Sequence, residues 1–185
     1  NAHQFRAAAA VVGDLTTDDR SKPTIAQITN GGFENGVKLR NAGPFEWQVG
    51  EAAEPQIGLS EDQKHGGRFG LTMVFNTFRP EGYRDISQQI AVEPGARYRL
   101  DAWYKSNLKT EAKYKWQILD ASTGKVLGTT QDLTPTDNWT AVSVEVAIPA
   151  ESDGIRLGLL RSGCTSVACP VTGTLAFDDL SLTKE

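Results

Sequence analysis

Two carboxylates near opposite ends of the sequence have the chemistry and the setting to bind a cation. Glu34 lies in the stretch ITNGGFENG, which begins at Ile28 and contains two Asn-Gly pairs that permit sharp turns. Phe33 is predicted to anchor this stretch in the core, so that Glu34 is held beside it. In the closing stretch GTLAFDDLSLTKE, the apolar positions change parity across Asp178-Asp179, which predicts a bulge or bend in the last strand.

A bend at Asp178 would direct its carboxylate toward the edge where the first strand begins, close to Glu34. Two carboxylates and the backbone carbonyls of a glycine-rich turn make an oxygen-only site that suits Ca²⁺. The alternative is that Glu34 accepts hydrogen bonds from the N–H groups of its turn and binds no metal.

A second set of residues, around Trp103, has the composition of a sugar-binding surface. Sugars stack their C–H faces on aromatic rings while polar groups around the ring fix their orientation. Trp103 shares its predicted strand face with a polar row, and two residues at outward parity on other strands are expected to complete it. The predicted ligand-binding residues are Trp103, Arg99, Asp101, Lys105, Gln89 and Arg156. The alternative, that Trp103 lies beneath a long loop as a satellite core residue, stays open.

The other aromatic residues are mostly expected in the core. The residues predicted at core parity are Trp47, Phe69, Phe75, Tyr98, Tyr104, Tyr114, Trp116 and Trp139. Trp103 is therefore the one tryptophan that the alternation places on an outward strand face.

Two cysteines lie close together in SGCTSVACP, at Cys164 and Cys169. Two thiols do not make a zinc site, which normally needs four ligands. A local disulfide is predicted for an exported protein, and a pair of reduced thiols in a cytosolic protein is the alternative.

No enzyme motif stands out in the sequence. Most nucleophilic triads need a histidine base, and His65 is the only histidine in the part expected to fold. Asp178-Asp179 and Glu61-Asp62 are adjacent pairs, whose side chains point to opposite faces of a strand and do not share a substrate. We therefore expect a protein that is not an enzyme.

Charge and hydropathy exclude two further classes of partner. The net charge is −4, with both signs interspersed, so nothing favours binding to nucleic acid. No apolar run approaches the roughly 20 residues of a membrane span, so no membrane insertion is expected.

The elements that must position these residues are strands. Period-2 alternation marks residues 67–76, 97–106, 141–149 and 154–162 as half-buried strands, with turn signals between them. With 185 residues, the chain predicts one domain. The expected fold is all-β, an antiparallel β-sandwich of about eight to ten strands over residues 25–185. Residues 1–24 are expected to be a linker or tail, or the end of a preceding helix.

Three ordered motifs resemble the jelly-roll carbohydrate-binding modules that are attached to xylanases and glucanases. They are NGGFE at residues 30–34, the strand EPGARYRLDAWYKS and the closing FDDLSL, within a resemblance that covers about residues 28–183. The resemblance implies a structural Ca²⁺ bound by Glu34, Asp178 and a backbone oxygen near Gly32, with a further carbonyl from Lys64 or His65. The insertion GCTSVACPV is not part of the common pattern, so the fold transfers better than the ligand.

The expected function is that of a non-catalytic, glycan-binding accessory module. It is expected to be part of a larger bacterial multidomain protein outside the cytoplasm, in the envelope, periplasm or medium. The alternative is a structural or protein-interaction domain of an envelope protein that binds no sugar.

Overall fold

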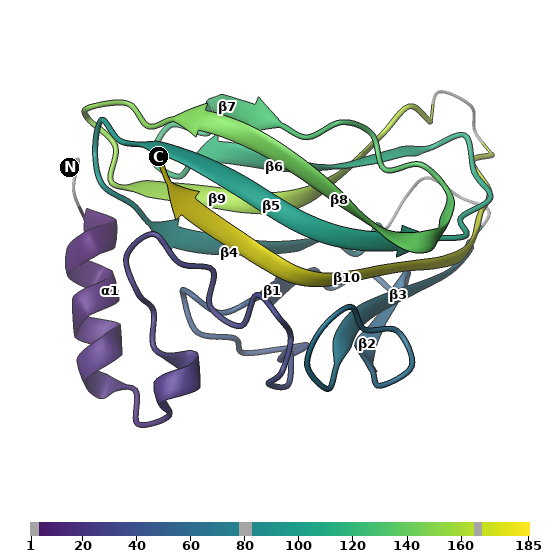
Figure 1. Cartoon of the computed structure of the whole chain (residues 1–185), viewed down its shortest axis with the longest axis horizontal. Helices are drawn as coiled ribbons and strands as arrows, with labels where there is room; N and C mark the ends of the chain where they lie inside the picture. Colours follow the sequence, from purple (N-terminus) through teal and green to yellow (C-terminus); the bar gives the residue numbers. More distant parts are fainter. Residues whose placement is uncertain (1–3, 78–82, 165–167) are drawn as a thin grey trace.

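A computed structural model describes residues 4–77, 83–164 and 168–185, which form an antiparallel β-sandwich (Figure 1). The elements in chain order are helix α1 (Gln4–Leu15), the 3-10 turn η1 (Asp19–Ser21), β1 (Gln48–Val49), β2 (Gln56–Ser60), β3 (Gly70–Thr77), β4 (Ile86–Ala91), β5 (Arg97–Ser106), β6 (Lys113–Asp120), β7 (Val126–Thr129), β8 (Thr136–Ala147), β9 (Gly154–Ser162) and β10 (Val171–Lys184). The predicted all-β jelly-roll class is confirmed.

The strands form two five-stranded sheets, which we call front and back by their place in Figure 1. The front sheet has the order β2-β3-β10-β5-β8, and the back sheet has the order β1-β4-β9-β6-β7. Apart from the β2–β3 and β6–β7 pairs, neighbouring strands within each sheet are not consecutive in sequence, so the chain crosses repeatedly between the two layers.

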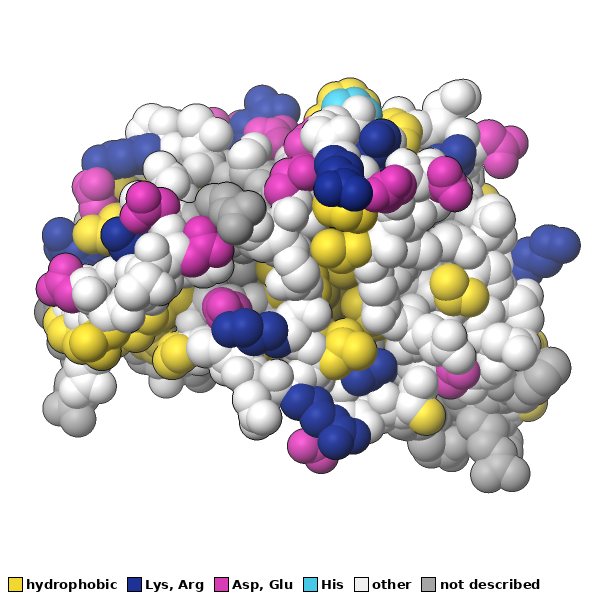
Figure 2. All heavy atoms as spheres, turned by 90° about the horizontal axis from the view of Figure 1, so that it is seen from below, with side chains coloured by type: hydrophobic (Ala, Val, Ile, Leu, Met, Phe, Trp, Pro, Cys, Tyr) yellow, Lys and Arg dark blue, Asp and Glu magenta, His cyan; other side chains and the backbone are white. Residues whose placement is uncertain are grey.

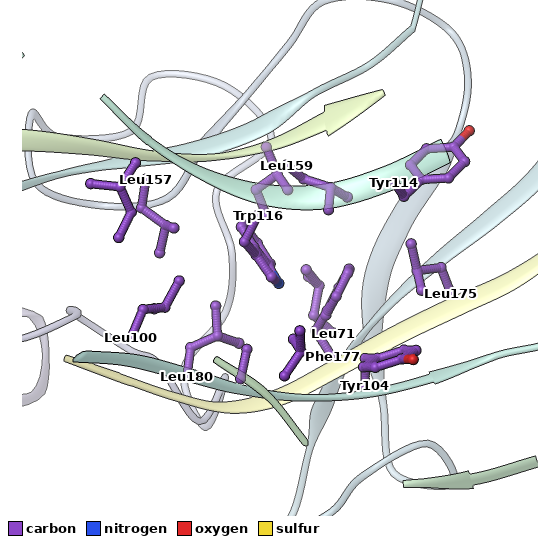
Figure 3. Packing of buried hydrophobic residues seen from close by; sticks show 14 of the residues in the cluster. Leu71, Leu100, Tyr104, Tyr114, Trp116, Leu157, Leu159, Leu175, Phe177 and Leu180 are labelled. Atoms are coloured by element: carbon purple, nitrogen blue, oxygen red, sulfur yellow. The ribbon is translucent and has the colours of Figure 1, made fainter. Parts of the chain in front are cut away.

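Alternating side chains explain why these segments form strands and where the core lies. Along β5, buried residues alternate with exposed or half-buried ones from Arg97 to Ser106, so one face packs inward and the other faces out. Trp116 and Tyr114 point inward as predicted, and Trp116 packs against Phe177 at a ring-centroid distance of 4.9 Å (Figure 3).

The segment before residue 24 contains a helix that packs on the domain. Ala9 of α1 is buried against Phe45 and Ala91, with Phe5 beside them. The buried carboxylate of Asp153 accepts hydrogen bonds from the N–H groups of Phe5 (3.4 Å) and of the next residue, and so satisfies the start of the helix. Part of the expected tail is thus packed on the back sheet.

The glycine-rich stretch near residue 30 is anchored as the sequence predicts. Phe33 is fully buried and lies 5.5 Å from the ring of Trp47. The Asn30 side chain closes the turn by bonding both the N–H and the carbonyl of Asn35. The N–H of Leu180 donates to the carbonyl of Gly31 (3.0 Å), which joins this stretch to the last strand.

The predicted bulge in the last strand is present. The register between β10 and β5 shifts between Asp178 and Ser181, and Asp179 has a φ of 48°. The bulge allows Asp178 to remain fully buried while Asp179 is exposed.

Candidate functional site

The predicted ligand-binding residues lie on two different sheets. Trp103 and its row belong to β5 in the front sheet, whereas Gln89 and Arg156 are paired neighbours on β4 and β9 in the back sheet. The expectation that Gln89 and Arg156 complete the Trp103 row is therefore wrong. Alternation fixes which residues face outward, but a sandwich has two outward faces.

The ring of Trp103 carries a second ring on its outer face. His65 stacks on Trp103 with centroids 4.0 Å apart and an interplanar angle of 14°, and Trp139 meets His65 edge-on at 5.8 Å. His65 Nδ1 lies 2.8 Å from a carboxylate oxygen of Asp179. Figure 2 shows hydrophobic, acidic and basic side chains gathered along one edge of the molecule. Trp103 is half-buried beneath His65.

Two aromatic predictions need correction. Trp139 is half-buried and lies outside the core cluster. It is three residues from the buried Val142, so strand alternation places the two on opposite faces. Phe69 is also half-buried, with the guanidinium of Arg68 over its ring at 4.8 Å. The rest of the polar row near Trp103 is present, and Arg99 pairs with Asp101 at 3.0 Å.

The buried carboxylate of Asp178 holds the loop that carries His65. One oxygen accepts N–H hydrogen bonds from His65 (2.7 Å) and Gly66 (2.9 Å), and the other accepts one from Asp179 (2.8 Å). Burial raises the pKa of Asp178, although the three N–H groups oppose that increase. Asp178 therefore fixes the loop from a position inside the fold.

Glu34 binds the same loop a few residues further along the chain. One of its carboxylate oxygens accepts hydrogen bonds from the N–H groups of Arg68 (2.8 Å) and Phe69 (3.2 Å). Among residues 4–77, 83–164 and 168–185, no group of three or more His, Cys, Asp or Glu side chains is arranged to hold a metal ion.

The predicted Ca²⁺ ligands thus lie near one loop. One oxygen of Asp178 and one oxygen of Glu34 accept N–H hydrogen bonds from this loop. Gly32 lies beside Asp178 and Asp179. A Cβ at this position would be 4.0 Å from Asp178 Oδ1. Lys64 precedes the amides that Asp178 binds. Calcium stays a prediction from the sequence.

The outer face of the back sheet forms a polar groove. One hollow of about 380 Å³ is lined by Ala42, Pro44, Gln48, Ser87, Gln89 and Arg156. A second, of about 180 Å³, is lined by Asp85, Gln117, Leu119, Arg156, Gly158, Leu159 and Leu160. Arg156 lines both hollows, so they adjoin at that side chain and extend across β1, β4, β9 and β6.

Strand register sets the floor of this groove. Gln48 pairs with Ser87, Ser87 with Gly158, and Gly158 with Gln117, which makes one row across four strands. Gly158 has no side chain, so the floor is low at the middle of the row. The side-chain amides of Gln89 and Gln117 have no hydrogen-bond partner among the described residues, which leaves them free to bind a polar ligand.

A stabilised loop forms one wall of the groove. Gln48 donates from its side-chain amide to the carbonyl of Gly43 (2.6 Å), and Glu46 accepts from the N–H of Gly43 (2.6 Å). Burial alone would raise the pKa of Glu46, but its hydrogen bonds with Lys38 and Gly43 lower it overall. The wall is therefore held in place before any ligand binds.

A larger hollow of about 610 Å³ lies between the end of α1 and this same loop. Its lining includes Val12, Leu15, Lys38 and Glu46. Lys38 and Glu46 bind each other at 2.8 Å, so their charges are mutually neutralised. The back-sheet groove is the stronger candidate for a ligand-binding site, because the side-chain amides of Gln89 and Gln117 have no hydrogen-bond partner among the described residues.

Sequence reasoning found Gln89 and Arg156 but not Gln48, Gln117 or Gly158. Gln117 and Gly158 have outward parity next to Trp116 and Leu157, so the alternation contained a signal for both. Nothing in the sequence marks Gln48, which is placed by the pairing of a two-residue strand.

The two cysteines form the predicted disulfide. Cys164 and Cys169 are bonded, with Cα atoms 5.8 Å apart. In the part of the chain that the structure describes, no helix is long and apolar enough to cross a membrane.

A comparison with known protein families finds a match for this chain. The sequence profile of a family described as "Carbohydrate binding domain" matches residues 26–159, more than half of the chain. No curated protein matches the sequence.

Several solved structures share the fold at low sequence identity. One, described as "CBM4 structure and function", has a TM-score of 0.62 and 15% identity and covers 85% of this chain and 99% of its own. TmCBM61 in complex with beta-1,4-galactotriose has a TM-score of 0.59 and 16% identity, with coverages of 84% and 96%. The CBM22-1-GH10 modules of Clostridium thermocellum xylanase 10B, complexed with xylohexaose, give 0.57 and 17%, with coverages of 87% and 29%. At these identities the likeness shows the fold alone.

Proposed function

This chain belongs to the carbohydrate-binding domain family, and on that premise we propose that it binds a glycan in the groove on the outer face of the back sheet. The observation that carries the proposal is the polar groove across β1, β4, β9 and β6, whose floor is low at Gly158 and in which the side-chain amides of Gln89 and Gln117 have no hydrogen-bond partner among the described residues. Sugar hydroxyls both donate and accept hydrogen bonds, and so does a glutamine amide. The groove runs across the strands, which suits an extended chain of sugars.

The site lies on a sheet, so its side chains are better ordered before binding than those of a loop surface. Gln89 and Gln117 project from paired strands, and Gln48 is tied to the wall loop, so little order must be gained on binding. Binding on an open face of this kind is expected to be weak, with a dissociation constant in roughly the micromolar to millimolar range.

We also propose that the domain is non-catalytic and serves as an accessory module of a larger bacterial protein outside the cytoplasm. The Cys164–Cys169 disulfide supports this location, because disulfides persist in oxidising compartments. The likeness to the modules of a xylanase, of which this chain covers 29%, supports the accessory role. The one histidine of the described residues, His65, stacks on Trp103 and pairs with Asp179, which does not suit a general base.

A glycine substitution tests the groove directly. A Cβ on Gly158 would meet Ser87 Cβ at 3.5 Å, an ordinary contact, so Gly158→Val should fold normally while filling the floor. In affinity gel electrophoresis with polysaccharides, we expect this variant to lose the retardation that the parent protein shows. Gly58→Val is the matched control, since Gly58 is an exposed strand glycine in the front sheet with nothing within 4 Å of its Cβ position.

Retardation that survives Gly158→Val would contradict the back-sheet site. It would favour the second surface, on the front sheet, where Trp103 and Trp139 place two half-exposed indoles beside Arg99 and Asp101. Aromatic rings support that surface because sugars stack on them. The stacked His65 counts against it, because a sugar would have to displace that ring.

A further inference from the structure

Arg156 has an unusual setting at the point where the two hollows of the groove meet. Its side chain is 48% exposed, and a single nitrogen, Nη2, makes both of its contacts: Ser87 Oγ at 3.2 Å and Asp85 Oδ2 at 3.4 Å. A guanidinium has five N–H donors in a planar fork. The N–H group on Nε and the two on Nη1 have no partner among the described residues, so a tethered arginine keeps unused donors in the groove.

Among the described residues, the outward strand positions that line the back-sheet groove include no aromatic residue. They are Gln48 on β1, Ser87 and Gln89 on β4, Arg156, Gly158 and Leu160 on β9, and Gln117 and Leu119 on β6. A ligand gains no stacking energy from these positions, so they recognise it by hydrogen bonds and charge.

We infer that the glycan recognised by this groove carries carboxylate groups, as in a polymer of uronic acids, and that Arg156 binds the carboxylate through the free N–H groups of Nη1. The inference rests on the proposed function and names the ligand class of that same site. Hydrogen bonds between a guanidinium and a carboxylate are charge-assisted and roughly twice as strong as neutral hydrogen bonds. Such a contact supplies the affinity that the missing aromatic rings do not.

The local charge balance is compatible with an acidic ligand. Asp85 binds one nitrogen of Arg156 at 3.4 Å, and on the neighbouring strand Lys115 lies 3.8 Å from Asp132. Asp85 fixes the orientation of the guanidinium but also places a negative charge near the site. Removing that charge should therefore strengthen the binding of an acidic glycan.

The test uses affinity gel electrophoresis of the whole chain with polygalacturonate, polyglucuronate and alginate. Each polymer is used in its native form and after its carboxylates have been reduced to primary alcohols. Neutral xylan and glucan form a further arm, and dextran sulfate is included as an anion without carboxylates. We expect at least one native uronate polymer to retard the protein, and its reduced form to bind at least about tenfold more weakly.

Three variants test the role of Arg156. Arg156→Gln should weaken binding of the native uronate polymer roughly ten- to a hundredfold, because hydrogen bonds to a charged group are lost. Asp85→Asn should strengthen it about two- to fivefold. Arg99→Gln is the matched control, since Arg99 makes a similar exposed pair with Asp101 on the opposite sheet, and it should leave binding unchanged. Thermal unfolding confirms that each variant is folded.

Several outcomes would overturn the inference. In one such outcome, the parent protein binds reduced or neutral polymers as tightly as native ones while Gly158→Val abolishes that binding. That result would leave the proposed function intact and would refute carboxylate recognition. Equal binding of dextran sulfate would show general anion attraction, and an unaffected Arg156→Gln would exclude that residue. If no glycan retards the chain, the proposed function fails and the inference fails with it.

Discussion

Replacing Asp178 with alanine tests how the His65 loop is held. Asp178 is fully buried, and its carboxylate accepts the N–H groups of His65, Gly66 and Asp179 at 2.7, 2.9 and 2.8 Å. Asp178→Ala removes the acceptor and leaves these donors without a partner. The loop that lies over Trp103 should then loosen.

The structure gives the size of the effect. Leaving a buried donor unpaired costs about 1–3 kcal/mol, and two of the three donors belong to the loop. Because His65 is exposed and Gly66 is half-buried, water can reach part of this loop once it moves. We therefore expect the free energy of unfolding to fall by about 2–4 kcal/mol. For a chain of this size that corresponds to a decrease in Tm of roughly 4–16 °C.

The assay is thermal and urea unfolding, in excess calcium and in excess chelator. The hydrogen bonds predict a loss in chelator, since they need no metal. If the calcium predicted from the sequence also binds Asp178, the loss in calcium will be larger by the binding term. Asp179→Asn is the control, because Asp179 is exposed, and asparagine tolerates its φ of 48°. An Asp178→Ala variant as stable as the parent in chelator would refute the reasoning.

Two further substitutions probe the stacked ring and the core. Trp103→Ala should lower the free energy of unfolding by about 1–3 kcal/mol, less than for a core tryptophan, because the ring is half-buried under His65. Its retardation by polysaccharide should be unchanged if the back sheet is the site, and lost retardation would favour the front sheet. Burial raises the pKa of Tyr114 to about 12, and its hydroxyl has no hydrogen-bond partner among the described residues. A tyrosine in the unfolded chain ionises near pH 10, so the free energy of unfolding should fall as pH rises from about 10 to 12. Tyr114→Phe should reduce that loss in urea unfolding measured across this range, and Tyr83, whose pKa burial also raises, should account for part of what remains. At pH 7 the stability should be unchanged or higher by about 1 kcal/mol. A variant with the same alkaline decline as the parent would show that Tyr114 does not contribute to it.

The sequence by itself determined the local features of this protein. Alternation located β3, β5, β8 and β9 to within a few residues at most ends, because a half-buried strand repeats every two residues. The glycines and asparagines around Phe33 indicated the turn, and the change of parity at Asp178 indicated the bulge. The spacing of the two cysteines suited the disulfide. Each of these features depends on neighbours in the chain.

Only the tertiary structure decided which residues meet. Arg156 and Trp103 are both outward-facing, yet they lie on opposite sheets, because β9 and β5 are assigned to their layers by long-range pairing. The stacking of His65 on Trp103 likewise needs Asp178, which is 113 residues from His65 along the chain. Strand periodicity has only two states, inward and outward, so it carries no information about which of two outer faces a side chain joins.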